Sequence, residues 1–167
     1  MKSKQKVIAI IPARSGSKGL KNKNLKLFNK KPLIFYPINA ALKSGVVDTV
    51  LVTTDSKKIS KIAKQYGAEV PFLRPKKFSG DLATTEVTLK DALIKYEKLN
   101  KIEFDICVFL TATDIFRSVE WIKDCVNFLK TNKNYESIFS GHKTHKNFWI
   151  FDKKKWVRLK PFMKIYA

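Results

Sequence analysis

Residues 6–24 read KVIAIIPARSGSKGLKNKN and pass from an apolar run into a polar loop. Residues 6–11 are almost continuously apolar, which is typical of a strand buried on both faces of a parallel sheet. Residues 12–24 are rich in Gly, Ser, Lys and Asn and predict a loop. Ligands of open α/β sheets bind at the carboxyl ends of the strands, so this loop is the first candidate for a binding site.

The rest of the chain alternates short β-rich runs with longer helical runs. The predicted strands are 49–54, 104–110 and 137–140, and a hairpin is predicted from 147–151 and 155–159. The predicted helices are 33–43, 55–66, 84–96 and 119–130, with Gly45 and Gly67 ending the first two. This repetition implies βαβ units with right-handed crossovers, hence an α/β fold with a mostly parallel sheet. We expect one domain over residues 1–167.

Composition places the chain among globular proteins, because 44% of its 167 residues are hydrophobic. No apolar run approaches the ~20 residues that span a bilayer, and the basic start leads into a strand and not a signal peptide. A cytoplasmic location without membrane contact is therefore expected. The two cysteines have no metal-ligand spacing, and both are predicted to be reduced thiols, with Cys107 in the core.

The net charge of +20 has two interpretations. One is a polyanionic partner such as a nucleic acid or a membrane. The other is a surface rich in solvated lysines, which we favour because the lysines are spread along the chain without a nucleic-acid-binding motif. A nucleic-acid partner is therefore not expected. A basic surface would still attract an anionic nucleotide and an acidic sugar.

The loop at 12–24 combines small residues with cations. Its small residues allow main-chain N–H groups to approach an anion closely; they are Ser15, Gly16, Ser17 and Gly19. Its cations can neutralise a triphosphate; they are Arg14, Lys18, Lys21 and Lys23. The pattern is neither GxxxxGK[ST] nor GxGxxG, which disfavours a P-loop or dinucleotide fold. The alternative of a solvated, Lys-rich turn is less favoured, since a buried strand leads directly into the loop.

Residues 11–24 read IPARxxSKGxxxKN when the variable positions are left open, and this resembles the signature of the acylneuraminate cytidylyltransferase family. These are the CMP-sialic acid synthetases and their relatives that act on other 2-keto sugar acids. Further matches follow in the family's order: Lys31-Pro32-Leu33, Thr53-Thr54-Asp55-Ser56, Arg74-Pro75 with Asp81 and Thr84-Thr85, Leu110-Thr111-Ala112-Thr113, and Arg117. The resemblance implies a Rossmann-like, three-layer α/β/α nucleotidyltransferase fold.

The resemblance also implies an activity. CMP would pass from CTP to a 2-keto sugar acid such as sialic, legionaminic or pseudaminic acid: the anomeric hydroxyl attacks the α-phosphorus, pyrophosphate leaves and Mg²⁺ assists. The loop at 14–19, with Arg14, Lys18 and Lys23 as its cations, would hold the triphosphate, and Asn24 would lie near the ribose or α-phosphate. The implied cytosine contacts are Arg74, Ala83 and Thr85. Further implied substrate contacts are Thr111, Thr113 and Arg117.

The sequence departs from the family in the loop after the predicted strand at 104–110. The family usually has LQPTSPLR, whereas residues 110–117 read LTATDIFR. Thr111 replaces the usual Gln, a sugar contact, so a different sugar is expected. Asp114 is either an Mg²⁺ ligand or an N-terminal cap or first-turn acid of the next helix, and we favour the second role.

Family members continue beyond the point that residue 167 matches, so the resemblance implies an amino-terminal portion of such an enzyme. Residues 145–167 would begin a dimerisation or sugar-side arm, and the main Mg²⁺ carboxylates would lie in the absent segment. A homodimer is one expected state. The alternatives are an incomplete nucleotide-binding fragment, a nucleotidyltransferase that uses another nucleotide, and, less favoured, a basic nucleic-acid-binding domain.

Overall fold

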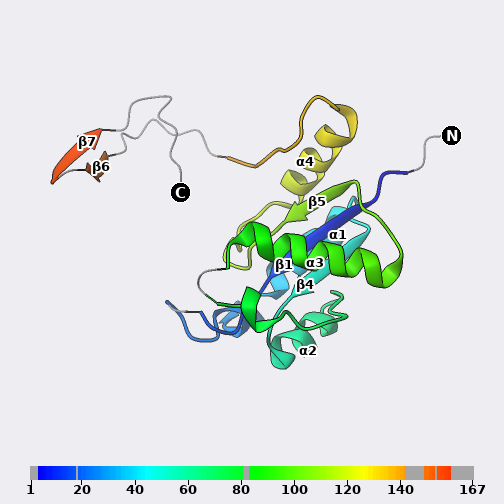
Figure 1. The fold of residues 1–167 in the computed structure, drawn as a ribbon, viewed down its shortest axis with the longest axis horizontal. Coiled ribbons are helices and arrows are strands. Elements are labelled where there is room, and N and C mark those ends of the chain that lie inside the picture. The colour runs from blue at the N-terminus through cyan, green and yellow to red at the C-terminus, as the bar shows by residue number, and fades with distance from the viewer. Residues whose placement is uncertain (1–3, 18, 81–82, 142–148, 153, 159–167) are drawn as a thin grey trace.

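The computed structural model describes residues 4–17, 19–80, 83–141, 149–152 and 154–158. Its centre is a three-stranded sheet formed by β1 (Val7–Pro12), β4 (Thr49–Thr53) and β5 (Ile106–Phe109). The strand order is β4-β1-β5, and both pairs are parallel (Figure 1). The predicted parallel sheet is therefore confirmed.

The side chains of β1 divide the core into two parts. Val7, Ala9 and Ile11 face a large apolar cluster to which α1 (Phe35–Ser44), α2 (Lys57–Gln65) and α4 (Val119–Thr131) contribute. Ile8 and Ile10 face a smaller cluster with α3 (Thr85–Asn100). In Figure 1, α3 crosses in front of the sheet and α1 lies behind it. The arrangement is the expected three-layer α/β/α fold, and it explains why β1 is apolar at both odd and even positions.

The four predicted helices are confirmed within one or two residues at most of their ends, but α3 runs four residues beyond its predicted end at 96. Ser56 and Thr84 accept hydrogen bonds from main-chain N–H groups of the first turns of α2 and α3, at 3.3 Å each. Ser118 does the same for α4. Gly45 and Gly67 have φ of 66° and 90°, a left-handed conformation that glycine adopts without steric cost.

Short elements complete the described chain. A 3-10 turn, η1 (Lys23–Leu25), precedes the hairpin of β2 (Leu27–Phe28) and β3 (Lys31–Pro32), and a second turn, η2 (Lys76–Phe78), precedes α3. The predicted hairpin near the end is confirmed as antiparallel β6 (Trp149–Asp152) and β7 (Lys155–Arg158).

Two predictions are wrong. Residues 137–140 form no strand; they are exposed, and no described segment pairs with them. Cys107 is exposed and not in the core, because α3 packs over β1 and β4 and leaves this face of β5 uncovered. Neighbouring atoms nevertheless desolvate the Cys107 sulfur. This desolvation, together with the negative charge of Glu97, raises the pKa of the thiol to about 11.

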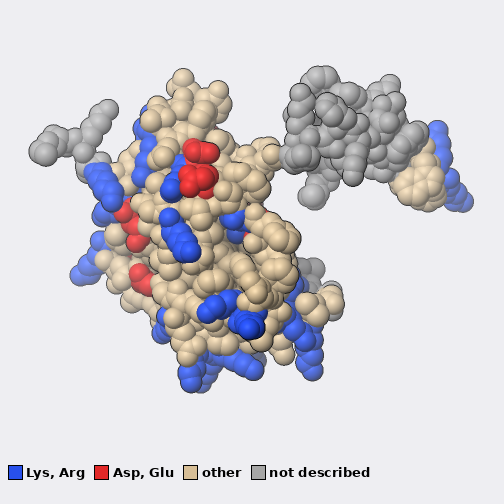
Figure 2. Space-filling model, turned by 180° about the vertical axis from the view of Figure 1, so that it is seen from behind, with Lys and Arg blue, Asp and Glu red and all other residues tan. Residues whose placement is uncertain are grey.

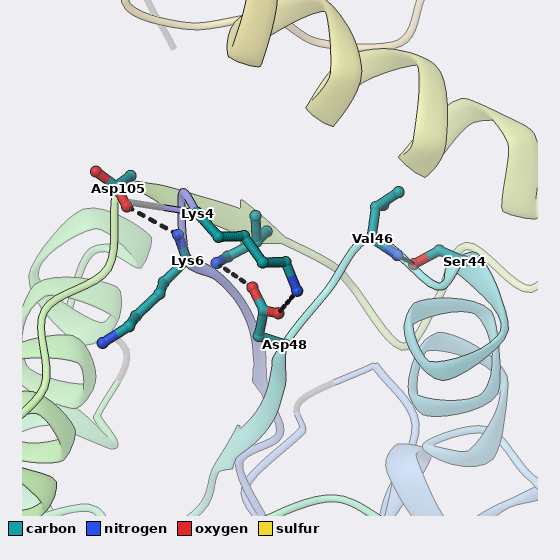
Figure 3. A network of polar contacts seen from close by, with 7 residues as sticks. Lys4, Lys6, Ser44, Val46, Asp48 and Asp105 are labelled. Carbon is teal, nitrogen blue, oxygen red and sulfur yellow. Dashed lines mark hydrogen bonds and ion pairs between the residues drawn. The ribbon is translucent and has the colours of Figure 1, made fainter. Parts of the chain in front are cut away.

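Two carboxylates fasten the amino-terminal ends of the strands (Figure 3). Asp48 accepts hydrogen bonds from the Lys4 ammonium and the Val7 N–H, both at 2.9 Å. Asp105 accepts a hydrogen bond from the Lys6 N–H at 2.8 Å. These contacts lie at the end of the sheet opposite to the loop that follows β1.

Basic and acidic side chains are both visible on one face of the molecule (Figure 2). Figure 2 shows Lys and Arg side chains over several parts of one face, with acidic side chains among them, and not a single continuous basic patch. Within the described residues, no helix is long and apolar enough to cross a bilayer.

Candidate functional site

A cavity of about 590 Å³ opens at the carboxyl ends of β1 and β5. Its walls come from the loop after β1, the segment between β4 and α3, the first turns of α3 and the loop after β5. The lining residues are Pro12, Arg14, Ser17, Gly19, Leu20, Lys23, Asn24, Arg74, Phe78, Gly80, Ala83, Thr85, Thr88, Phe109, Thr111, Ala112 and Thr113. The segments that sequence analysis singled out therefore meet at one place.

Most of the predicted site residues line this cavity: Arg14, Ser17, Gly19, Lys23, Asn24, Arg74, Ala83, Thr85, Thr111 and Thr113. Among the described residues, four predicted ones do not line it: Ser15, Gly16, Asp114 and Arg117. Lys18, predicted to contact the triphosphate, lies outside the described residues.

The loop after β1 is held in place by its own neighbours. The Ala13 N–H donates to the Thr53 carbonyl at 2.9 Å, which extends the pairing of β1 with β4 by one step. Asn24 is buried, and its side-chain amide donates to the Arg14 carbonyl at 2.9 Å. Asn24 thus fixes the main chain at Arg14, while its predicted contact with ribose or phosphate stays a prediction.

Asp55 makes a two-point contact with the same loop. Its two carboxylate oxygens accept hydrogen bonds from the main-chain N–H and from the hydroxyl of Ser15, both at 2.8 Å. The hydroxyl of Ser15 is therefore directed to Asp55. Sequence analysis placed Asp55 in a family motif and did not count it as part of the site.

Arg74 is a buried cation at the boundary of the cavity, with only 7% of its surface exposed. Its guanidinium donates to the Thr53 carbonyl at 2.6 Å and to the Phe78 carbonyl at 3.3 Å. Its Nε is buried and has no hydrogen-bond partner within the described part of the chain. Burial lowers the pKa of Arg74 and Asp55 partly offsets this, but a guanidinium stays charged at physiological pH.

The amino terminus of α3 faces the cavity through Thr85 and Thr88. The preceding residue, Thr84, caps the helix through its hydroxyl. A 16-residue helix carries a partial positive charge at this end, which favours an anionic or electron-rich ligand.

The loop after β5 is organised by Arg117. This side chain donates to the Thr111 carbonyl at 3.3 Å and forms an ion pair with Asp114 at 3.1 Å. Burial lowers the pKa of Arg117, and Asp114 opposes the shift. The favoured role of Asp114 as a helix cap or first-turn acid is wrong, because Ser118 caps α4 and Glu120 is the first-turn acid. Asp114, which differs from the usual family sequence, thus forms an ion pair with Arg117 inside this loop.

Sequence analysis missed several apolar and small wall residues: Pro12, Leu20, Phe78, Gly80, Thr88, Phe109 and Ala112. Phe109 ends a strand whose pattern gives no sign that 44% of this residue is exposed. A signal did exist for Thr88, which lies one helical turn after Thr84 on the same face of a predicted helix.

No group of three or more His, Cys, Asp or Glu side chains that would suit a metal ion occurs among the described residues. The Asp114 carboxylate is engaged with Arg117 and does not line the cavity. The described residues thus form no metal site made by protein groups alone.

Residues 8–159 match the sequence profile described as cytidylyltransferase. The chain belongs to the cytidylyltransferase family. The resemblance recognised in the loop after β1 is therefore confirmed, and it extends over most of this cytidylyltransferase-family chain.

Curated relatives agree with this assignment. The CMP-N,N'-diacetyllegionaminic acid synthase of Legionella pneumophila is 40% identical over 134 residues, covering 80% of this chain and 57% of that protein. The N-acylneuraminate cytidylyltransferase of Escherichia coli is 40% identical over 141 residues, covering 84% of this chain and 32% of that protein. The pseudaminic acid cytidylyltransferase of Campylobacter jejuni is 40% identical over 102 residues, covering 61% and 44%. The chain thus spans about half or less of the length of these relatives.

Solved structures confirm the fold of this family member. A CMP-2-keto-3-deoxy-manno-octonic acid synthetase in complex with CTP superposes with a TM-score of 0.63 at 22% identity, covering 77% of this chain and 49% of that one. A 4-diphosphocytidyl-2C-methyl-D-erythritol synthase superposes with a TM-score of 0.64 at 12% identity, covering 95% and 73%. At these identities the likeness concerns the nucleotidyltransferase fold alone.

Proposed function

We propose that this chain binds CTP in the 590 Å³ cavity and carries the nucleotide half of a transferase that moves CMP to a 2-keto sugar acid. The observation that carries the proposal is the meeting, in one cavity, of the loops that the family motifs occupy, with Arg14, Lys23 and Arg74 in its walls. The named relatives act on legionaminic, acylneuraminic and pseudaminic acids, and we extend this class of substrate to the present chain.

The chemistry assigned to the cavity is charge stabilisation and positioning. Attack by the sugar hydroxyl on the α-phosphorus forms a P–O bond and breaks the bond to the β-phosphate. The hydroxyl proton passes to solvent, and the pyrophosphate leaves with additional negative charge. Arg14 and Lys23 supply positive charge where the triphosphate would lie. Preorganised cations of this kind account for much of the catalysis of phosphoryl and nucleotidyl transfer.

Recognition of cytosine is assigned to the side of the cavity near Arg74. Cytosine presents two acceptors, O2 and N3, beside an amino donor. Arg74 lines the cavity, and a guanidinium carries N–H donors that match such acceptors.

Mg²⁺ is part of this proposal as a companion of the triphosphate. The ion is commonly held by substrate phosphates together with one or two carboxylates. No described residue is assigned as its ligand, and the steps above do not depend on it.

A cytoplasmic location is also proposed, as is a homodimer, which is supported by the exposed aromatic pair Phe151 and Trp156.

The first test is nucleotide binding. We expect calorimetry to show CTP binding more tightly than UTP, ATP or GTP, and Arg14→Ala to weaken CTP about tenfold to a hundredfold, the value of a charge-assisted hydrogen bond. Lys43→Ala, which removes an exposed cation from the last turn of α1, is the matched control and should leave CTP affinity unchanged. Equal affinity of wild type and Arg14→Ala would refute the site assignment, and a preference for a purine nucleotide would refute the choice of base.

The second test is turnover. Pyrophosphate release would be measured with CTP, Mg²⁺ and a panel of eight-carbon and nine-carbon 2-keto sugar acids. We expect release with at least one of these acids and none without an acid. CTP binding without release from any acid would support the incomplete-fragment alternative.

A further inference from the structure

We propose that Asp55 is a positioning residue that holds the loop after β1 in the shape in which it binds the triphosphate; this rests on the proposed function. Asp55 and Ser15 are joined by two hydrogen bonds of 2.8 Å each. Both carboxylate oxygens of Asp55 accept hydrogen bonds from the same residue, which lies 40 positions earlier in the chain.

The place of this contact in the sheet explains its role. β1 and β4 are adjacent and parallel, and Pro12 is in register with Thr53. The Ala13 N–H continues the ladder to the Thr53 carbonyl, and two residues later the Ser15 N–H is taken up by Asp55. The carboxylate therefore replaces the main-chain carbonyl as the last link between the strands, at the point where the loop turns into the cavity.

The loop needs such a link because it has little regular structure. Between Ala13 and Gly19, the described residues form neither helix nor strand, and one short turn joins the Ser17 N–H to the Ser15 carbonyl at 3.0 Å. Fixing the main chain of a residue costs conformational entropy. If Asp55 fixes Ser15 before the nucleotide arrives, binding does not have to meet that cost.

Because Asp55 is negatively charged, the direction in which nucleotide affinity changes on its removal distinguishes two roles. A carboxylate next to a triphosphate site opposes anion binding, and Asp55 and Arg14 both act electrostatically on Arg74, so the three charges are neighbours. If the charge of Asp55 were its main effect, its removal would tighten nucleotide binding. If Asp55 positions the loop, removal of the side chain weakens binding although a repulsive charge is lost.

The experiment compares three variants of the full chain by calorimetry with CTP and with inorganic tripolyphosphate, which reports on the phosphate loop alone. Asp55→Ala should weaken both ligands about tenfold, because each ligand would then have to order the loop itself. Asp55→Asn should stay within about threefold of wild type, because an amide can accept from the Ser15 N–H and donate to the Ser15 hydroxyl. Ser15→Ala, which loses only one of the two bonds, should lie between them.

The matched control is Asp48→Ala. Asp48 also accepts one hydrogen bond from a main-chain N–H, that of Val7 at the start of β1, and one from the side chain of Lys4. It lies at the opposite end of the sheet (Figure 3). This variant should lose stability and keep its affinity for CTP and tripolyphosphate. Amide hydrogen exchange at residues 13–17 should accelerate in Asp55→Ala and not in Asp48→Ala.

The outcomes separate the two proposals. Unchanged or tighter binding in Asp55→Ala, with wild type binding CTP, overturns the role of Asp55 and leaves the proposed function standing. A loss in Asp55→Asn as large as in Asp55→Ala also overturns it, because an amide that can make both hydrogen bonds to Ser15 would then fail to hold the loop. Failure of wild type to bind CTP overturns the proposed function and this inference with it. If Asp55→Ala does not fold, Ser15→Ala decides: unchanged affinity overturns the inference and weakened affinity supports it.

Discussion

At the scale of single residues, Arg74 connects the stability of the fold with the cavity. Its guanidinium joins the end of β4 to the η2 turn by donating to the Thr53 and Phe78 carbonyls. A lysine keeps the charge but has no planar fork that reaches both carbonyls. We expect Arg74→Lys to lower the free energy of unfolding by about 1–3 kcal/mol, measured by urea denaturation. The same variant should show a smaller rise in melting temperature with CTP; a variant as stable and as CTP-responsive as wild type would contradict both roles.

The sequence indicates Arg74 and Asp55 as motif residues but not what they touch. Asp55 reaches Ser15 because two adjacent parallel strands end in register, and this follows from the order of strands. Arg74 reaches Phe78 because a 3-10 turn directs that carbonyl inward. Strand order and turn conformation are set by packing across the whole sheet, so a local motif does not contain them.

At the scale of elements, the amino terminus of α3 carries both a capping residue and part of the cavity wall. Thr84→Ala removes the hydroxyl that accepts from the Val87 N–H, which costs about 1 kcal/mol of stability. Because Thr85 and Thr88 line the cavity, fraying of this turn should also weaken CTP binding, by about threefold to tenfold. Urea denaturation and calorimetry measure the two effects.

Ser118→Ala is the matched control for this prediction. Ser118 caps α4 in the same way, and the described residues of α4 do not line the cavity. The control should lose similar stability and keep its CTP affinity. An equal loss of affinity in both variants would show that general destabilisation, and not the α3 turn, is responsible.

Helices were better predicted than strands for a physical reason. A helix satisfies its hydrogen bonds internally, so the cap at Thr84 and the glycine at position 45 are sufficient local signals. A strand needs a partner, and residues 137–140 show β-like composition without any described neighbour to pair with. The exposure of Cys107 has a similar origin, because the position of α3 over the sheet decides which face of β5 is covered.

At the scale of the whole molecule, the two ends of the sheet carry different structural features. The carboxyl ends carry the cavity with Arg14 and Arg74, and the amino-terminal ends carry the Asp48 and Asp105 contacts (Figure 3). Carboxylates thus hold the chain at both ends, and only the Asp55 contact lies in the loop proposed to bind the nucleotide. We therefore expect that stability can be changed at the amino-terminal end of the sheet without a change in CTP affinity at the other end.

The pH dependence of stability tests this separation. Burial by itself would raise the pKa of Asp48, but hydrogen bonds from Lys4 and the Val7 N–H outweigh it and lower the pKa below the ordinary value of 3.8. The folded state therefore favours the ionised carboxylate, so the contribution of Asp48 to stability is complete above about pH 4 and is lost as the pH falls through the lowered pKa. We expect Asp48→Ala to cost up to about 1 kcal/mol at pH 7, because the ion pair is partly exposed, and progressively less as the pH falls below 4.

Urea unfolding between pH 3 and pH 7 measures this difference, with Asp124→Ala as a control for loss of an exposed carboxylate on α4. At pH 7 the control should cost less stability than Asp48→Ala, because no described hydrogen bond or ion pair holds this exposed carboxylate. A cost of Asp48→Ala that stays constant down to pH 3 would mean that the neutral acid makes the same contacts, and the lowered pKa would be wrong. If CTP affinity at pH 7 fell in Asp48→Ala, the two ends of the sheet would be coupled, because loosening the start of β1 would then be felt at the loop that follows its other end.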